Sequence, residues 1–360
     1  MKAIIQVTDH NKKRRTWSVA NDDQNPDQKL SRTPSEVISR DTEAIEGRSQ
    51  RTPSADSVER QELFVSEQPI RSLDHLVVSD ITLHQIQSML AKVEHHHFLY
   101  EQWNLKKVDP YGGRTVINLY GPPGTGKSFC AEAIAAALGK RIIRVSYAEI
   151  ESKYVGDTPK NIKAAFAKAK QDDALLFFDE ADSILGRRLT NVTQSADHGV
   201  NVSRSVMLIE LDRFDGITIF ATNLASNYDS AFVRRILGHI EMPLPNSTGR
   251  ERLWRLHIPQ EMDNSLQSPD DYETLSVLSE GLSGGDILNA VVTAAIIAVQ
   301  RVGRERTVNL GDLTTAIAQV RKAKEDVGNS TYGASYSLTK LPIDQSPTDI
   351  QQQLRPNDNK

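Results

Sequence analysis

Strand-like apolar runs alternate with helical patterns along the middle of the chain. The runs are Thr115–Leu119, Arg141–Ser146, Ala174–Phe178 and Ile217–Ala221, and each has the length of a strand. Between them, apolar residues recur at three- and four-residue spacings, which is typical of a helix with one buried face. The expected helices are Ser128–Leu138, Pro159–Lys170 and the segment that holds Val206, Leu208, Ile209 and Leu211. This order predicts an α/β fold, with a parallel sheet sandwiched by helices.

The strand pattern stops at Pro243 and Pro245. Four helical patterns follow it, at Thr248–His257, Tyr272–Ser279, Gly285–Val302 and Asp312–Lys324. We therefore place a domain boundary near Pro245. We expect an α/β domain over residues 63–245 and a small all-helical domain over residues 246–326.

Both ends of the chain are polar. Residues 1–62 mix acids with bases and hold few aromatic residues, and residues 327–360 are rich in Gly, Ser, Gln and Pro. Such segments bury too little apolar surface to offset the entropy of ordering, so we expect two disordered arms. The tetrapeptide Arg-Thr-Pro-Ser occurs at Arg32–Ser35 and again at Arg51–Ser54, either by chance or as a repeated docking or phosphorylation site.

Composition and charge narrow the class of protein. The 360 residues include 43 basic and 47 acidic side chains, and a net charge of -4 argues against a nucleic-acid coat. The single cysteine, Cys130, excludes a disulfide within the chain and a cysteine zinc site. The longest apolar stretch, Ala290–Val299, is far shorter than the ~20 residues that cross a bilayer. The first residues show no signal-peptide pattern, so we expect a cytoplasmic protein.

A glycine-rich loop follows the first apolar run. Its sequence fits G-x-x-x-x-G-K-[ST] between a predicted strand and a predicted helix, which is the context that a phosphate-binding loop requires. Lys127 is expected to bridge the β- and γ-phosphates of ATP, and the Ser128 hydroxyl to ligate Mg²⁺. The predicted cradle consists of Gly121, Pro122, Pro123, Gly124, Thr125, Gly126, Lys127, Ser128 and Phe129.

Two carboxylates follow the buried run Ala174–Phe178. Because ligands of parallel sheets bind beyond the carboxyl ends of the strands, Asp179 is expected to face the Mg²⁺ and Glu180 to polarise the attacking water as a general base. The alternative is an acidic pair that caps the next helix. We assign Asp182 to that helix.

The sequence GPPGTGKS, followed some fifty residues later by FFDEAD, resembles the AAA group of the AAA+ ATPases. Further segments are similar to that family's pore loop, inter-subunit signalling segment, sensor strand end, arginine-finger segment and lid motif. These segments are Lys153–Asp157, Leu211–Gly216, Ala221–Asn223, Asp229–Arg235 and Leu282–Ile287. Together they cover about residues 73 to 325.

This resemblance implies an ATP hydrolase that assembles as a ring, a hexamer in this family, and remodels or threads protein substrates. It implies that Asn223 holds the attacking water or the γ-phosphate, and that Arg234 reaches a neighbour's nucleotide. It places Gly284 and Gly285 of the helical lid at the nucleotide, and Tyr154, Val155 and Gly156 in the pore loop.

Several alternatives stay open at this point. Asn223 could be a turn residue and Arg234 a surface ion pair. Where two-finger members have a Gly-Arg pair, this chain reads Ile236-Leu237-Gly238-His239, so either Arg235 supplies the second charge or one finger operates. The rival functions are a nucleotide-gated scaffold and a DNA-directed ATPase. His95, His96 and His97 are adjacent and cannot converge on one metal ion from a helix, so we interpret them as a solvated helix face.

Overall fold

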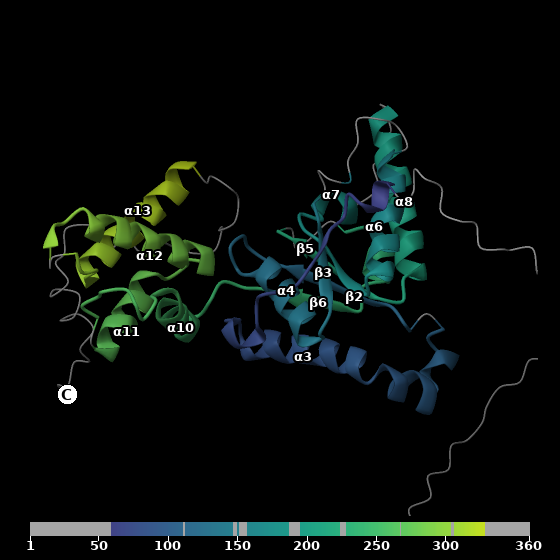
Figure 1. Ribbon diagram of the computed structural model, residues 1–360, viewed down its shortest axis with the longest axis horizontal. Coiled ribbons are helices and arrows are strands. Elements are labelled where there is room, and N and C mark those ends of the chain that lie inside the picture. The colour runs from purple at the N-terminus through teal and green to yellow at the C-terminus, as the bar shows by residue number, and fades with distance from the viewer. Residues whose placement is uncertain are drawn as a thin grey trace, which may run out of the picture. The chain divides into compact units, whose positions relative to one another are not determined.

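The computed structural model of the chain (Figure 1) describes residues 59–110, 112–146, 150, 157–186, 195–223, 228–266, 268–303 and 306–327. Most of the N-terminal arm, the segment 151–156 and the tail beyond residue 327 lie outside these ranges.

The strands between residues 66 and 241 form a six-stranded sheet, in the order β1-β3-β4-β5-β2-β6. Only β1 is antiparallel to its neighbour, and the other pairs are parallel, which confirms the predicted α/β class. The two edge strands were not predicted. The strands are β1 Ser66–Glu67, β2 Thr115–Tyr120, β3 Arg141–Val145, β4 Ala174–Phe178, β5 Ile217–Thr222 and β6 Gly238–Glu241.

Helices cover both faces of this sheet (Figure 1). Successive side chains of a strand point to opposite faces, so Phe177 and Phe178 of β4 enter two separate cores. Phe178 packs with Phe166 and Phe214 beneath α6 and α8, while Phe177 belongs to the core beneath α3 and α4. The helices are α3 Asp80–Glu94, α4 Lys127–Ala137, α6 Asp157–Gln171, α7 Asp182–Leu185, α8 Ser195–Arg213 and α9 Ser230–Val233.

The strand register brings the functional segments to one edge of the sheet. Tyr120 at the end of β2 pairs with Thr222 at the end of β5, and Phe178 at the end of β4 pairs with Phe220 of β5. The phosphate loop, the acidic pair and Asn223 therefore leave three adjacent strands at the same edge.

The four predicted C-terminal helices are present and enclose a core of their own. They are α10 Ser247–His257, α11 Pro269–Leu278, α12 Gly284–Val299 and α13 Leu310–Val327. Trp254 is fully buried there, and its Nε1 donates to Ser279 Oγ at 3.0 Å. Capping boxes formed by Ser268 and Ser283 fix the starts of α11 and α12. No helix in the described ranges is long and apolar enough to cross a membrane.

The histidine triplet does not share one solvated helix face, because α3 already ends at Glu94. His95 is the C-cap of that helix, and His96 stacks half-buried on Tyr100 with ring centroids 4.6 Å apart. A π-helical turn follows at Phe98–Gln102, and a 3-10 turn follows that at Leu105–Lys107. A second 3-10 turn precedes α3, at Leu73–His75. Within the described residues no three metal-ligating side chains cluster.

Candidate functional site

The phosphate loop depends on glycine at positions with positive φ. Gly121 has φ 146°, and a Cβ there would lie 2.3 Å from the Met242 carbonyl oxygen. Gly124 has φ 75°, and a Cβ would lie 2.4 Å from Ser283 Oγ. Gly126 caps α4 with φ 90° and faces open space, so the main chain at the start of the helix stays accessible to a ligand.

Lys127 forms hydrogen bonds with residues that follow β2 and with the residue that follows β5. Its Nζ donates to the carbonyl oxygens of Gly121 and Pro122, at 2.8 and 2.9 Å, and to Asn223 Oδ1 at 2.8 Å. Burial lowers the pKa of this lysine, while Asp179 and Asp182 oppose that shift. All three bonding acceptors are neutral, so an anionic phosphate is a stronger partner than any group the lysine now contacts.

Ser128 and Asp179 form a second pair at the same edge. The serine hydroxyl, in the first turn of α4, donates to Asp179 Oδ2 at 2.8 Å. A hydroxyl and a carboxylate are the oxygen ligands that Mg²⁺ accepts beside phosphate. The donor set therefore fits the predicted metal at Ser128 and Asp179.

Glu180 adopts an unusual main-chain conformation. Its φ is 51°, in the left-handed region that non-glycine residues rarely occupy, and its N–H donates to Asp179 Oδ1 at 2.9 Å. The carboxylate is exposed to solvent. Such strain concentrates at functional sites, and the geometry leaves Glu180 accessible to water directly beside the Ser128–Asp179 pair.

Asn223 follows β5 and lies next to the phosphate loop through its bond to Lys127, so the structure unites the residues that sequence reasoning assigned to this edge. Asp182 begins α7, as predicted. Its side chain also contacts the end of β5, because its Oδ1 accepts a hydrogen bond from the Thr222 hydroxyl. Sequence reasoning missed that contact, because no pattern marks which side of a short helix faces a strand end.

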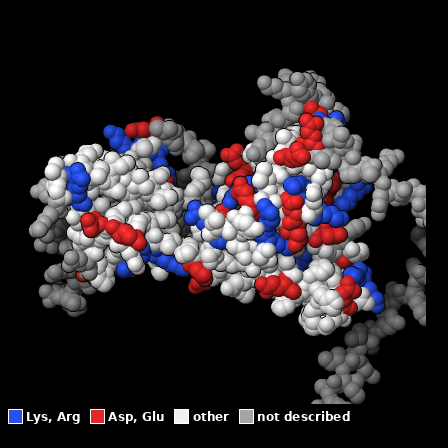
Figure 2. Space-filling view, in the orientation of Figure 1, with Lys and Arg blue, Asp and Glu red and all other residues white. Residues whose placement is uncertain are grey.

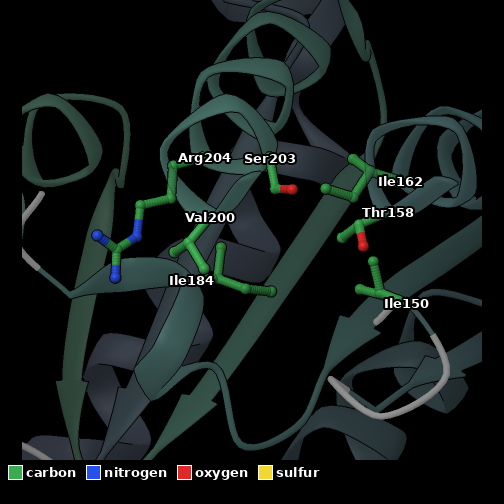
Figure 3. Close-up of a pocket in the computed structure, with 7 residues that line it drawn as sticks. All are labelled: Ile150, Thr158, Ile162, Ile184, Val200, Ser203 and Arg204. Atoms are coloured by element: carbon green, nitrogen blue, oxygen red, sulfur yellow. The ribbon is translucent and has the colours of Figure 1, made fainter. Parts of the chain in front are cut away.

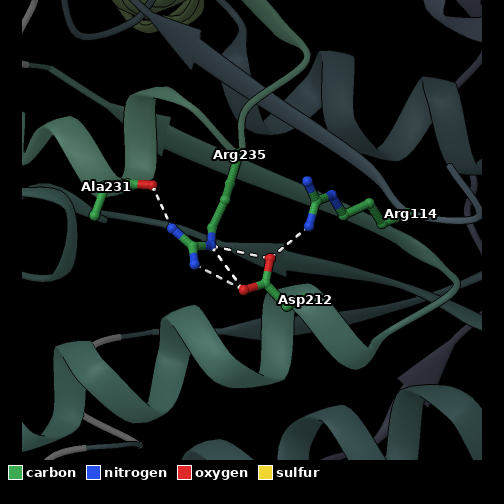
Figure 4. Close-up of polar contacts among 4 residues, drawn as sticks. All are labelled: Arg114, Asp212, Ala231 and Arg235. Atoms are coloured by element: carbon green, nitrogen blue, oxygen red, sulfur yellow. Dashed lines mark hydrogen bonds and ion pairs between the residues drawn. The ribbon is translucent and has the colours of Figure 1, made fainter. Parts of the chain in front are cut away.

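The two arginines after α9 have different surroundings. Arg234 is exposed, and its side chain makes no hydrogen bond or ion pair with any residue that the structure describes. Arg235 is held inside its own chain (Figure 4): its Nη2 donates to Asp212 Oδ2 at 2.7 Å and its Nη1 to the Ala231 carbonyl at 2.9 Å. Arg114 bonds the same Asp212 carboxylate from before β2.

The start of α12 touches the phosphate loop. The Gly285 N–H donates to the Gly124 carbonyl oxygen at 3.0 Å. A Cβ added at Gly284 would lie 3.5 Å from the same oxygen. The predicted lid motif thus lies against the predicted cradle. Ser283 and Asp286 fix this end of the helix, and Lys324 Nζ pairs with Asp286 Oδ2 at 2.6 Å.

The model for the "ATPase family associated with various cellular activities (AAA)" matches residues 117–244. Residues 117–244 are an AAA domain. The matched residues run from β2 to the segment after β6 and include the phosphate loop, the acidic pair, Asn223 and Arg234.

Curated relatives are similar to this chain over longer stretches than the AAA domain alone. The 26S proteasome subunit RPT4 of Saccharomyces cerevisiae is 34% identical over 223 residues, which are 60% of this chain and 50% of that protein. The proteasome-activating nucleotidase of Methanopyrus kandleri is 32% identical over 269 residues, 73% of this chain and 59% of the relative. The chain therefore spans between half and three-fifths of the length of these relatives.

The predicted pore-loop residues Tyr154, Val155 and Gly156 lie outside the described residues of the AAA+ domain. Among the described residues, a small, mainly apolar cavity lies between α6 and α8 (Figure 3). No sequence signal had indicated it. Its lining consists of Ile150, Thr158, Ile162, Ile184, Val200, Ser203 and Arg204.

Proposed function

We propose that the chain is a cytoplasmic ATPase that hydrolyses ATP in an oligomeric ring and uses the cycle to remodel or thread proteins. The observation that carries this proposal is the paired arrangement at the sheet edge: Lys127 bonded to Asn223, and Ser128 bonded to Asp179. A lysine, a hydroxyl–carboxylate pair, an exposed carboxylate and an amide lie there beyond the ends of three adjacent strands, as a site for phosphate, Mg²⁺ and an attacking water would require. We keep residues 63–245 and 246–326 as the two domains, and residues 1–62 and 327–360 as the arms.

The phosphate loop would hold the nucleotide. The N–H groups at the start of α4 and the Lys127 ammonium both attract the β- and γ-phosphates. When bound, Mg²⁺ neutralises charge that develops on the phosphate oxygens, and Ser128 and Asp179 would hold it. Gly284 and Gly285 would close the cradle from the lid, since Gly285 already bonds the Gly124 carbonyl.

Glu180 and Asn223 would handle the attacking water. The exposed carboxylate of Glu180 accepts the proton as the water attacks. Asn223 would orient the water or the γ-phosphate from the end of β5. A protein that only switches on nucleotide binding has no need for a general base next to a sensor amide, which favours turnover over a scaffold role.

Two observations support assembly with further copies of the chain. Arg234 is exposed and bonds nothing in the described part of its own chain, as expected of a side chain that completes a neighbour's site. The helix α12 carries an exposed apolar stripe, and in Figure 2 the surface over it is a broad area with charged side chains only at its borders. A helix that is apolar on every side is normally covered. The stripe consists of Leu288, Val292, Ile296 and Val299.

The proposal that the substrate is a protein rests on the relatives and on the resemblance of Lys153–Asp157 to a pore loop. The relatives are a 26S proteasome subunit and a proteasome-activating nucleotidase, so both are named for the proteasome. Tyr154, Val155 and Gly156 would grip a polypeptide in the channel of a hexamer. The net charge of -4 gives no support for a nucleic-acid substrate.

Replacing Glu180 tests the proposed chemistry. We expect Glu180→Gln to keep ATP affinity and to lose about 10²–10⁴-fold in turnover, because an amide cannot accept the water's proton. Phosphate release and ATP titration on the same preparation measure both quantities, and Glu261→Gln, an exposed glutamate of the helical domain, is the matched control. With ATP bound, the stalled variant should retain a protein client in a pull-down. Turnover within about threefold of the original would exclude Glu180 as the base.

A further inference from the structure

The end of the N-terminal arm runs along α6. Arg60 contacts the first turn of this helix, where its Nη2 donates to Asp157 Oδ1 at 3.1 Å and its Nη1 to Asn161 Oδ1 at 2.9 Å. Further along, the Ser66 hydroxyl donates to Asp172 Oδ2 at 2.6 Å, just beyond the last residue of α6. In Figure 1 the purple start of the ribbon accordingly lies beside α6. These contacts, at opposite ends of the helix, hold the junction between arm and domain against it.

The same stretch of chain also contacts β3. Its strand β1 pairs with the middle of β3. Phe64, which is only 2% exposed, belongs to the same apolar core as Ile150 and as Ile162 of α6. In the chain, β3 precedes the predicted pore loop and α6 follows it. The junction therefore contacts both elements that the loop connects.

Asn161 extends this contact to the residue on the other side of the predicted loop. It is 6% exposed, and its Nδ2 donates to the Ile150 carbonyl oxygen at 3.1 Å. Ile150 directly precedes the segment 151–156, and Asp157 directly follows it. Arg60 thus bonds one flank of the segment directly and is linked to the other flank through Asn161.

Arg60 is not needed to attach the arm, because the burial of Phe64 and the pairing of β1 already do so. An exposed ion pair would also contribute little to stability. The side chains of Arg60 and Asp157 are instead only 21% and 20% exposed, and the planar guanidinium spans two acceptors at once. Lys160 Nζ lies farther from Asp157 Oδ1, at 3.6 Å. The contact is therefore suited to fixing the position of the first turn of α6.

We propose that Arg60 is a positioning residue for the pore loop, and that through it the position of the loop depends on the N-terminal arm. This inference rests on the proposed gripping of a polypeptide by Tyr154, Val155 and Gly156. Residues 1–59 continue from the Arg60 contact, so a client bound to them is tethered to the frame of the loop. Arg60 bonds α6 and not the phosphate loop, so its loss should leave ATP binding unchanged.

Amide hydrogen exchange on the whole chain with ATP tests the contact without any client. Arg60→Ala removes two half-buried hydrogen bonds, so exchange in the first turn of α6 should become about fivefold faster, with exchange in β4 unchanged. Lys168→Ala is the matched control, because it breaks a similarly exposed pair with Asp172 at the other end of α6. Arg60→Lys keeps the charge but cannot span both acceptors, so it should lie between Arg60→Ala and the original. Equal exchange in Arg60→Ala and Lys168→Ala would overturn the inference.

Capture of a protein tests whether the position of the loop matters. The probe is fluorescein-labelled casein, which has no stable fold, and the background is Glu180→Gln with ATP bound. Adding Arg60→Ala should lower the retained casein about threefold to tenfold with the Kd for ATP unchanged, because a loop that is not held in place binds more weakly. Adding Lys168→Ala should change neither quantity.

The variant Tyr154→Ala in the same background separates the two ways to fail. If Tyr154→Ala lowers the retained casein and Arg60→Ala does not, the positioning role is wrong and the pore loop stands. If Tyr154→Ala retains as much casein as the background, the pore role is wrong and the positioning role falls with it. Should Arg60→Ala fail to fold, Arg60→Lys replaces it under the same criteria, with a smaller expected loss.

Discussion

The phosphate loop follows β2, and α9 with Arg234 precedes β6, the strand that pairs with β2. Lys127 of the loop and Arg234 nevertheless have opposite surroundings. Lys127 is buried and bonded to three oxygens of its own chain, whereas Arg234 is exposed and bonded to none that the structure describes. A cation bonded within its chain belongs to a half-site that is already assembled. Under the proposed function, Arg234 instead belongs to a half-site that a second subunit would complete.

The largest expected effect on ATP binding comes from the half-site around Lys127, which is already assembled within one chain. Lys127→Ala removes a buried cation from the phosphates, so we expect ATP affinity to fall by more than about 100-fold. Titration with fluorescent ATP measures this loss, and Lys140→Ala, which removes a lysine paired with the exposed Asp173, is the control. Equal affinities for the two variants would refute the phosphate-loop assignment.

The arginines provide the next comparison. If Arg234 alone reaches the neighbour, Arg234→Ala should cost about 10³–10⁵-fold in turnover with an unchanged melting temperature. Arg235→Ala breaks the bonds to Asp212 and Ala231, so it should lower the melting temperature by about 2–4 °C and cost less in turnover. Calorimetry and phosphate release separate the two. A second finger would instead show as a turnover loss for Arg235→Ala that matches Arg234→Ala, with no change in melting.

The smallest expected effect concerns the helical domain. Val292 is half exposed on the α12 stripe, so Val292→Asp should leave the melting temperature of the single chain nearly unchanged. If a neighbouring copy covers the stripe, the added charge should weaken self-association by about tenfold or more. Sedimentation at several concentrations tests this, with Thr315→Asp on the exposed face of α13 as the control. The same association for both variants would remove the stripe from the interface.

Much of the fold followed from the sequence because its signals are local. Apolar runs such as Ala174–Phe178 and the helices after Pro245 have strong periodicity, and the structure contains them with ends shifted by a few residues. β1 and β6 were missed because Ser66–Glu67 and Gly238–Glu241 are short and lack an apolar pattern. Their pairing comes from neighbouring strands, which a local pattern does not encode.

The candidate site likewise holds residues that the sequence predicts and contacts that it does not. The residues around Lys127 and Asp179 could be predicted, since a loop motif and the ends of parallel strands place them. The ion pair of Arg235 with Asp212 could not, because 23 positions separate the two residues and they meet only in the folded chain. The left-handed φ of Glu180 and the pairing of Asn118 with His239 likewise depend on tertiary contacts.

The most direct test of the shared site is ATP turnover by an equimolar mixture of Arg234→Ala and Lys127→Ala subunits, after mass photometry has confirmed mixed rings. Each variant alone should be nearly inactive. In random rings, one interface in four joins an intact phosphate loop to an intact Arg234, so the mixture should recover up to about a quarter of the original turnover. Verified mixed rings with no more activity than the separate variants would contradict the account.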